Sequence, residues 1–159
     1  MENLETHLNE VARIAVRLEA ETGWPAQLLI AQWAIESEWG TKPAGNANYF
    51  GVKKAARHQL CCTVTTHEVE NGERIEKTLE FADYTSLEDS CRDYAWLITQ
   101  GAPYSAAWAQ YLSDRDLHAL IRSIAGKYAT NPEYPNLVWA VARQANVVRA
   151  ISMATQETA

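Results

Sequence analysis

The apolar residues near the start of the chain recur every three or four positions, as they do on one face of a helix. This set comprises Leu4, Leu8, Val11, Ala15 and Leu18. We predict an amphipathic helix over residues 3–22, ended by Gly23. The next segment, residues 26–39, is apolar on nearly every side, which is typical of a buried helix. Pro25 suits its first position, and Gly40 suits the residue after its end.

A second pattern covers residues 63–81, around the dipeptide Asn71-Gly72. Apolar and polar residues tend to alternate there, as they do in a β-strand. That dipeptide favours a two-residue hairpin turn because both central residues of a type I′ turn need positive φ. The predicted pairs are Glu70 with Glu73, Val69 with Arg74, Glu68 with Ile75, His67 with Glu76, and Val64 with Leu79. Since side chains alternate between faces, Glu68 shares the more apolar face of this hairpin. It either lines a cleft against the helices or is solvated near the turn.

Helical patterns return after the hairpin. Ser86 followed by Asp89 resembles a capping box, and the apolar stripe behind it runs to Gly101. A short segment begins at Pro103 and ends at Tyr111, and Ser113 with Asp116 suggests another helix start. Asn131-Pro132 suits the start of a final helix, whose stripe is Val138, Val141, Ala145 and Val148. We expect a polar, frayed tail over residues 152–159. The order predicts a mainly helical α+β fold with one hairpin.

Composition narrows the possible classes of function. With 159 residues and no linker or repeat, we expect one domain. The net charge of −6 argues against general nucleic-acid binding, and no apolar run is long enough for a membrane span. The first residues lack the pattern of a secretory signal. Six Trp and seven Tyr against two Phe supply rings that suit a sugar-binding cleft, although a plain core also uses them.

The spacing of the cysteines and histidines indicates neither a disulfide framework nor a metal site. Cys61 and Cys62 are adjacent and Cys91 is separate, so we expect free thiols or at most one bridge to Cys91. The four histidines are scattered, and no spacing suggests a zinc site. We therefore expect no metal and no cofactor.

Glu36 is the candidate for acid chemistry. Trp33 and Trp39 lie three residues before and after it on the predicted helix, which would place both indoles beside its carboxyl group. A carboxyl group held against apolar rings loses hydration, and its pKa rises. Such a group can act as a general acid near neutral pH. The alternative is a solvated carboxylate at a fraying helix end.

Residues 41–67 contain no acidic residue but carry Lys42, Lys53, Lys54 and Arg57. The interpretation that we favour is a solvated basic loop. The sharper alternative is a patch that meets an anionic group of a substrate.

Two carboxylates on different elements, facing one cleft lined by aromatic rings, are sufficient for glycoside hydrolysis. One protonates the leaving oxygen, and the other activates water, attacks, or stabilises the cationic intermediate. The sequence shows no nucleophile elbow, phosphate loop, zinc-protease motif or dinucleotide fingerprint that would favour another reaction.

Five segments in this order resemble glycoside hydrolase family 73, the peptidoglycan N-acetylglucosaminidases. They are Ala31-Gln32 through Glu36-Ser37 to Trp39-Gly40, Asn48-Tyr49-Phe50-Gly51-Val52-Lys53, Thr65-Thr66-His67-Glu68 before Asn71-Gly72, Phe81 with Tyr84, and Tyr128-Ala129-Thr130-Asn131-Pro132. The chain departs from the family pattern at Glu38, where a small residue is usual, and at Ala82, where Arg is usual.

The resemblance implies a lysozyme-like helical body with a small β-hairpin lobe, in a single glucosaminidase domain over residues 1–151. It implies Glu36 as the general acid, Glu68 as the second carboxylate and Tyr128 as the supporting tyrosine, with Tyr134 as the other candidate. The substrate-binding residues that we expect with it are Trp33, Trp39, Asn48, Tyr49, Phe50, Lys53 and Tyr134.

The implied substrate is the β-1,4-linked glycan strand of peptidoglycan, and we expect a monomer acting on the bacterial cell wall. Without a signal peptide, the chain would be released by phage lysis or leave by a dedicated export route. The alternatives are a lytic transglycosylase, a muramidase-type lysozyme, or a silent domain that only binds glycan.

Overall fold

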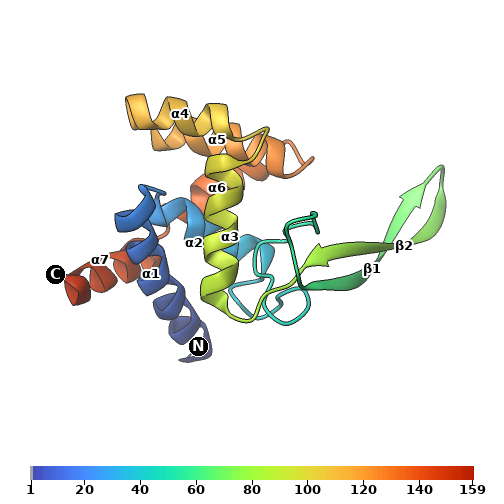
Figure 1. Ribbon diagram of the computed structural model, residues 1–159, viewed down its shortest axis with the longest axis horizontal. Helices are drawn as coiled ribbons and strands as arrows, with labels where there is room; N and C mark the ends of the chain where they lie inside the picture. Colours follow the sequence, from blue (N-terminus) through green and yellow to red (C-terminus); the bar gives the residue numbers. More distant parts are fainter. Residues whose placement is uncertain (1) are drawn as a thin grey trace.

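The computed structural model describes the backbone of residues 2–159 and all of their side chains except those of Glu2, Glu68 and Val69. Within this range, the helices gather into one body and a single hairpin projects from its side (Figure 1). The elements are α1 (Glu2–Thr22), α2 (Ala26–Glu36), β1 (Cys61–Glu70), β2 (Glu73–Ala82), α3 (Leu87–Gln100), α4 (Ser105–Asp114), α5 (Leu117–Tyr128), α6 (Tyr134–Ala142) and α7 (Ala145–Thr158). The expected mainly helical α+β fold is confirmed.

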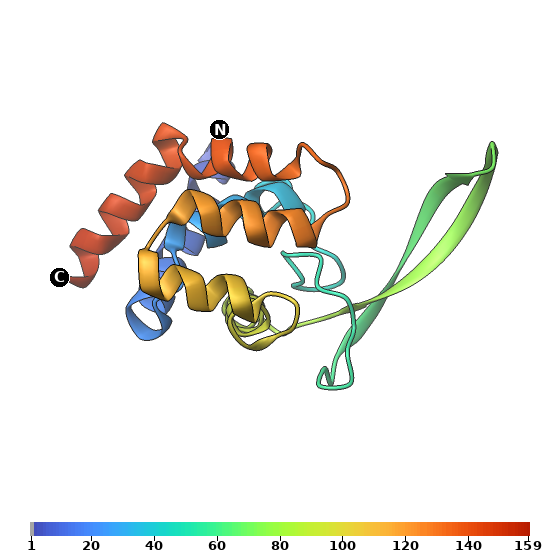
Figure 2. The same ribbon diagram turned by 90° about the horizontal axis from the view of Figure 1, so that it is seen from above.

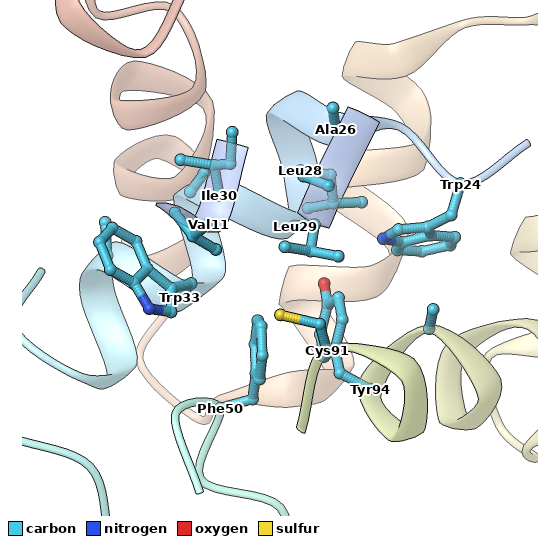
Figure 3. Packing of buried hydrophobic residues seen from close by; sticks show 14 of the residues in the cluster. Val11, Trp24, Ala26, Leu28, Leu29, Ile30, Trp33, Phe50, Cys91 and Tyr94 are labelled. Carbon is cyan, nitrogen blue, oxygen red and sulfur yellow. The ribbon is translucent and has the colours of Figure 1, made fainter. Parts of the chain in front are cut away.

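Helix α2 is the centre of the helical body, with α1, α6 and α7 packed against it. Every residue from Leu28 to Ala34 is buried, as its all-round apolar sequence predicts. Figure 3 shows the side chains of α2 facing Val11 of α1 on one side and the rings of Phe50 and Tyr94 on another. Pro25 precedes the helix as its N-cap, with extended backbone, rather than occupying its first turn.

The hairpin has the register that the Asn71-Gly72 turn predicts. Glu68 pairs with Ile75, and the pairing continues from Glu70–Glu73 at the turn to Cys61–Ala82 at the base. Both turn residues have positive φ, 51° and 81°.

In the described part of the hairpin, its base is what joins it to the body. Lys53 pairs with Phe81, and the amide of Ala82 donates to the carbonyl of Val52 at 3.0 Å. The turn end points away from the helices in both views (Figures 1 and 2).

The predicted starts of the later helices are partly right. Ser86 caps α3, because its hydroxyl accepts the amide of Asp89 at 3.1 Å. The predicted cap at Ser113 is wrong, since Ser113 lies inside α4 and Asp116 caps α5 through the amide of Ala119.

The predicted final helix is two helices, α6 and α7, separated at Arg143 and Gln144. Gln144 has extended backbone, which turns the chain so that α7 packs against α1. The expected frayed tail is instead the last part of α7. Ala154 is buried there, and Glu157 accepts a hydrogen bond from Arg13 at 2.6 Å.

All three cysteines are free thiols, with Cys91 buried in the core and Cys61 exposed at the hairpin base. None of the described helices is long and apolar enough to cross a bilayer.

Candidate functional site

Glu36 is the last residue of α2, so its partly buried carboxyl group stands at the end of the most buried helix. The helix was predicted to continue to residue 39, and it does not. Glu38, Trp39 and Gly40 have left-handed φ angles of 47°, 58° and 81°. The turn is held by Ser37, whose hydroxyl donates to the carbonyl of Trp33 at 2.6 Å and accepts the amide of Gly40 at 2.9 Å.

The helical spacing that predicted the Trp39 indole beside Glu36 does not hold, because residue 39 has left the helix. The ring of Trp39 instead meets the ring of Trp33 edge-on, with centroids 6.3 Å apart. Trp33 is 1% exposed and lies under Gly40, where an added Cβ would be 2.6 Å from its Cζ2 atom. Trp33 is therefore part of the core, and the substrate contact expected of it is not available.

Tyr134, the first residue of α6, donates a hydrogen bond from its hydroxyl to Oε1 of Glu36. Burial raises the pKa of Glu36, and this hydrogen bond lowers it by a smaller amount because it favours the ionised form. The expected direction of the shift is confirmed, although a tyrosine is the contact that the structure records.

A buried polar chain holds Tyr134 in this orientation. The hydroxyl of Tyr94 donates to Oε1 of Gln32, and Nε2 of Gln32 lies 3.5 Å from the hydroxyl oxygen of Tyr134, to which it donates. Gln32 is fully buried. Because the amide occupies a lone pair of Tyr134, the proton of that hydroxyl is directed at Glu36.

The other carboxyl oxygen of Glu36 faces Gly51. This glycine has a left-handed φ of 64°, and an added Cβ would lie 3.2 Å from Oε2 of Glu36. A side chain at residue 51 would crowd the carboxyl group, so glycine leaves Oε2 accessible.

Asn48 and Phe50 position the loop that carries Gly51, and both are buried. The side-chain amide of Asn48 donates to the carbonyls of Val52 and Ala82 at 2.9 and 2.8 Å, and its oxygen accepts the amides of Phe50 and Val52. Phe50 stacks on Tyr94 with ring centroids 4.3 Å apart. The substrate contacts expected of Asn48 and Phe50 are thus replaced by structural roles.

The remaining candidates lie around this loop. The hydroxyl of Tyr128 donates to the carbonyl of Phe50 rather than to Glu36, while its ring stacks on Tyr134 at an interplanar angle of 9°. Tyr49 is half-buried, and its amide donates to the hydroxyl of Ser90 in α3 at 3.2 Å. Burial raises the pKa of its phenol. Lys53 is exposed.

The side chain of Glu68 lies outside the described part of the structure. Its backbone is separated from the hairpin turn by Val69 and Glu70, at the end of the hairpin that points away from the helices (Figure 2). The structure therefore brings together Glu36, Tyr134 and Gly51, but it does not bring the hairpin turn to them.

A cavity of about 530 Å³ adjoins the Glu36 site. Its walls come from the end of α3, the loop at 102–104, the end of α5, and six residues of the segment after Asn48: Gly51, Val52, Lys53, Ala55, Arg57 and His58. Gly51 and Tyr128 belong both to this wall and to the surroundings of Glu36. Among the described side chains, no group of three His, Cys, Asp or Glu residues could hold a metal ion.

Sequence reasoning missed Gln32 and gave Tyr134 second place. A signal for Gln32 was present: it lies four residues before Glu36, on the same side of a helix that is otherwise apolar. The departure at Glu38 also has a structural reading, because its left-handed φ is a conformation that glycine adopts more easily.

Comparison with known proteins assigns a family to this arrangement. The family described as mannosyl-glycoprotein endo-beta-N-acetylglucosaminidase matches residues 12–147. The peptidoglycan hydrolase FlgJ of Salmonella typhimurium is 34% identical over 144 residues, which are 84% of this chain and 45% of that protein. The probable N-acetylmuramidase of Lactococcus lactis subsp. lactis is 27% identical over 153 residues, 91% of this chain and 34% of that protein. The chain thus spans less than half the length of these curated relatives.

A solved structure agrees over nearly the whole chain. The crystal structure of a peptidoglycan hydrolase mutant from Sphingomonas sp. A1 superposes with a TM-score of 0.73 at 27% identity. The match covers 94% of this chain and 99% of that one. Helical body and hairpin therefore form a fold already known among peptidoglycan hydrolases.

Proposed function

Because this chain belongs to the glucosaminidase family, described as mannosyl-glycoprotein endo-beta-N-acetylglucosaminidase, we propose that it hydrolyses β-1,4 glycosidic bonds in the glycan strands of peptidoglycan. The observation that carries the proposal is Glu36, a carboxyl group at the end of a buried helix with its pKa raised by burial. The names of the relatives and of the similar solved structure support peptidoglycan as the substrate.

Glu36 acts as the general acid. A raised pKa keeps more of the carboxyl group protonated at a given pH, so that it can protonate the oxygen of the leaving sugar. Since Tyr134 donates to Oε1, the proton of the neutral carboxyl group is carried on Oε2, beside Gly51. That oxygen faces the residue without a side chain, where a glycosidic oxygen can approach.

Tyr134 is a positioning residue for this acid. As Glu36 gives up its proton, negative charge develops on the carboxyl group, and the hydroxyl of Tyr134 is already directed at it. The supporting role that the family resemblance assigned first to Tyr128 therefore falls to Tyr134. Tyr128 supports the Gly51 loop through the carbonyl of Phe50.

Glu68 is our candidate for the second carboxylate. As far as its residues are described, the hairpin is joined to the body at its base, through pairs such as Val52 with Ala82 and Lys53 with Phe81. The role of Glu68 requires a closed form in which the hairpin bends at this base and Glu68 approaches Glu36. In such a closed form the two carboxylates would flank the bond, as glycoside hydrolysis requires.

A second candidate function, lytic transglycosylation, is favoured by one observation: the turn end of the hairpin points away from Glu36 (Figure 2). A single glutamate suffices when the substrate itself supplies the nucleophile, and the product is then an anhydro sugar. Because the chain is also similar to a probable N-acetylmuramidase, the test must also distinguish which of the two kinds of β-1,4 bond in the strand is cleaved.

The test is mass spectrometry of muropeptides after purified cell walls are digested by the wild type and by Glu36→Gln. We expect products with N-acetylglucosamine at the reducing end from the wild type and at least about a hundredfold less product from the variant. Products ending in N-acetylmuramic acid would identify a muramidase, and anhydro products, lighter by one water, would identify a transglycosylase. No glycan product at all from the wild type would contradict enzymatic function.

We also propose that the protein meets its substrate at the bacterial cell wall as a monomer. The location follows from the proposed substrate, because peptidoglycan is the material of the cell wall. The monomeric state is proposed because all of the site residues described above come from one chain. Sedimentation of the purified protein would check its oligomeric state.

A further inference from the structure

The cavity beside Glu36 has cationic and aromatic walls. Its lining includes three cationic side chains, Lys53, Arg57 and Lys127, and three aromatic rings, those of Trp96, Tyr104 and Tyr128. No Asp or Glu is among the described residues that line it. This concentration of positive charge occurs in a chain whose net charge is −6.

Two of these cations are not neutralised by the protein. Arg57 forms an ion pair with Asp93 at 3.1 Å and lies over the ring of Trp96, 4.3 Å from its centroid. Its charge is therefore already paired, and it contributes to the cavity as part of its lining. Lys127 donates to the carbonyl of Pro103 at 3.0 Å, an uncharged partner. Neither Lys53 nor Lys127 forms an ion pair with any residue that the structure describes.

The cavity is continuous with the surroundings of the proposed acid. Gly51 touches both the carboxyl group of Glu36 and the cavity, and Tyr128 lines the cavity while stacking on Tyr134. A glycan strand with its scissile bond at Glu36 would therefore bring a substituent of a neighbouring sugar to the cavity. In peptidoglycan, every second sugar bears a short peptide that ends in carboxylates and includes aliphatic side chains.

We propose that this cavity binds the stem peptide of the muramyl residue beside the cleaved bond. Its carboxylates pair with Lys53 and Lys127, and its aliphatic parts pack on Trp96 and Tyr104. A volume of about 530 Å³ lies within the range of pockets that hold small ligands. This inference rests on the proposed function and adds a determinant of substrate preference.

The experiment compares two substrates: glycan strands that retain their peptides, and the same strands stripped of peptide by an amidase. The measured quantity is the ratio of the initial rates on the two substrates. Exposed ion pairs are each worth up to about 1 kcal/mol, so two of them predict a wild-type ratio of roughly two to thirty. Lys53→Glu should bring the ratio to one or below, and Lys53→Gln combined with Lys127→Gln should bring it toward one.

Lys54→Gln is the matched control. Lys54 is the next residue, but it faces Glu80 at 3.9 Å and does not line the cavity, so its ratio should equal that of the wild type. A third substrate, with the peptide carboxylates converted to amides, separates charge from size. It should behave like the stripped strands if charge is recognised. Raising the salt concentration should lower the wild-type ratio, because exposed charges are screened.

The outcomes separate this inference from the function on which it rests. A wild type that cleaves both substrates at the same rate would overturn the stem-peptide site and leave the glycosidase intact. So would lysine variants that slow both substrates by the same factor, because those lysines would then contact sugar. A wild type that cleaves neither substrate would contradict the proposed function itself. Thermal melts of each variant would show that the lost preference does not come from unfolding.

Discussion

The hydroxyl of Tyr134 donates a hydrogen bond to the carboxyl group of Glu36 across 98 residues of sequence. It joins the start of α6 to the end of α2, the two ends at which these packed helices meet. The contact gives the proposed acid a fixed orientation, because Gln32 and Tyr94 hold the tyrosine from behind.

Changing Glu36 to Gln should stabilise the protein, and more so at higher pH. The pKa of Glu36 is raised in the fold, so the folded state binds more protons than the unfolded state between the ordinary glutamate pKa and the raised one. Wild-type stability therefore falls as pH rises through that interval, and Glu36→Gln escapes the loss. Urea unfolding of both proteins from about pH 4 to pH 8 would measure the growing difference.

The control for this variant is Glu38→Gln. Glu38 is exposed and paired with Lys42 at 2.9 Å, on the turn beyond the helix. We expect it to retain most activity on cell walls. Wall clearing that survives Glu36→Gln, or that is lost with Glu38→Gln, would remove Glu36 from its assigned role.

Changing Tyr134 to Phe should move the basic limb of the pH–rate profile to higher pH. The hydroxyl favours the ionised form of Glu36, so its removal raises the pKa of the acid further. The maximal rate should fall by roughly tenfold or more, since a hydrogen bond to a charged group contributes about 1.5–3 kcal/mol. Measuring kcat/KM against pH on a soluble muropeptide would show both effects.

Tyr128→Phe is the matched comparison. Its hydroxyl binds the carbonyl of Phe50, so we expect a stability loss of about 1 kcal/mol and a basic limb at the wild-type pH. A shifted limb in Tyr128→Phe, with none in Tyr134→Phe, would return the supporting role to Tyr128.

Changing Glu68 to Gln should lower turnover strongly and leave the melting temperature unchanged. The turn end of the hairpin stands away from the helices, so a substitution there removes little packing (Figure 1). Glu73→Gln, on the facing strand beside the turn, is the comparison and should stay active. If Glu68→Gln turns over as fast as the wild type, Glu68 is a solvated strand residue, and Glu70 or Glu73 becomes the candidate.

Changing Asn48 to Ala should destabilise the protein by about 2 kcal/mol or more. Its buried side chain makes four hydrogen bonds to backbone groups, each of which would lose a partner away from water. Asn46→Ala, which loses one bond to the carbonyl of Tyr84, should cost less. Thermal or urea unfolding would measure both, and equal losses would contradict the anchoring role of Asn48.

The sequence by itself determined the features that depend on neighbours in the chain. The register of the hairpin follows from the Asn71-Gly72 turn, because a two-residue turn leaves one way to pair the strands. The cap at Ser86 and the buried character of α2 are equally local. The first follows from a hydroxyl three residues before the amide that it accepts, and the second from a segment in which nearly every residue is apolar.

Tertiary structure decided the rest. Trp39 left the helix because Ser37 and Gly40 closed a left-handed turn over Trp33, a packing that no spacing rule contains. The predicted final helix is interrupted at Gln144, and this change of direction lets α7 pack against α1. Tyr128 ends α5 and Tyr134 begins α6, and the docking of α6 on α2 is what makes Tyr134 the partner of Glu36. The cavity beside them joins Lys53 to Lys127 across 74 positions of sequence (127 minus 53), a proximity that arises when distant helices pack on one core.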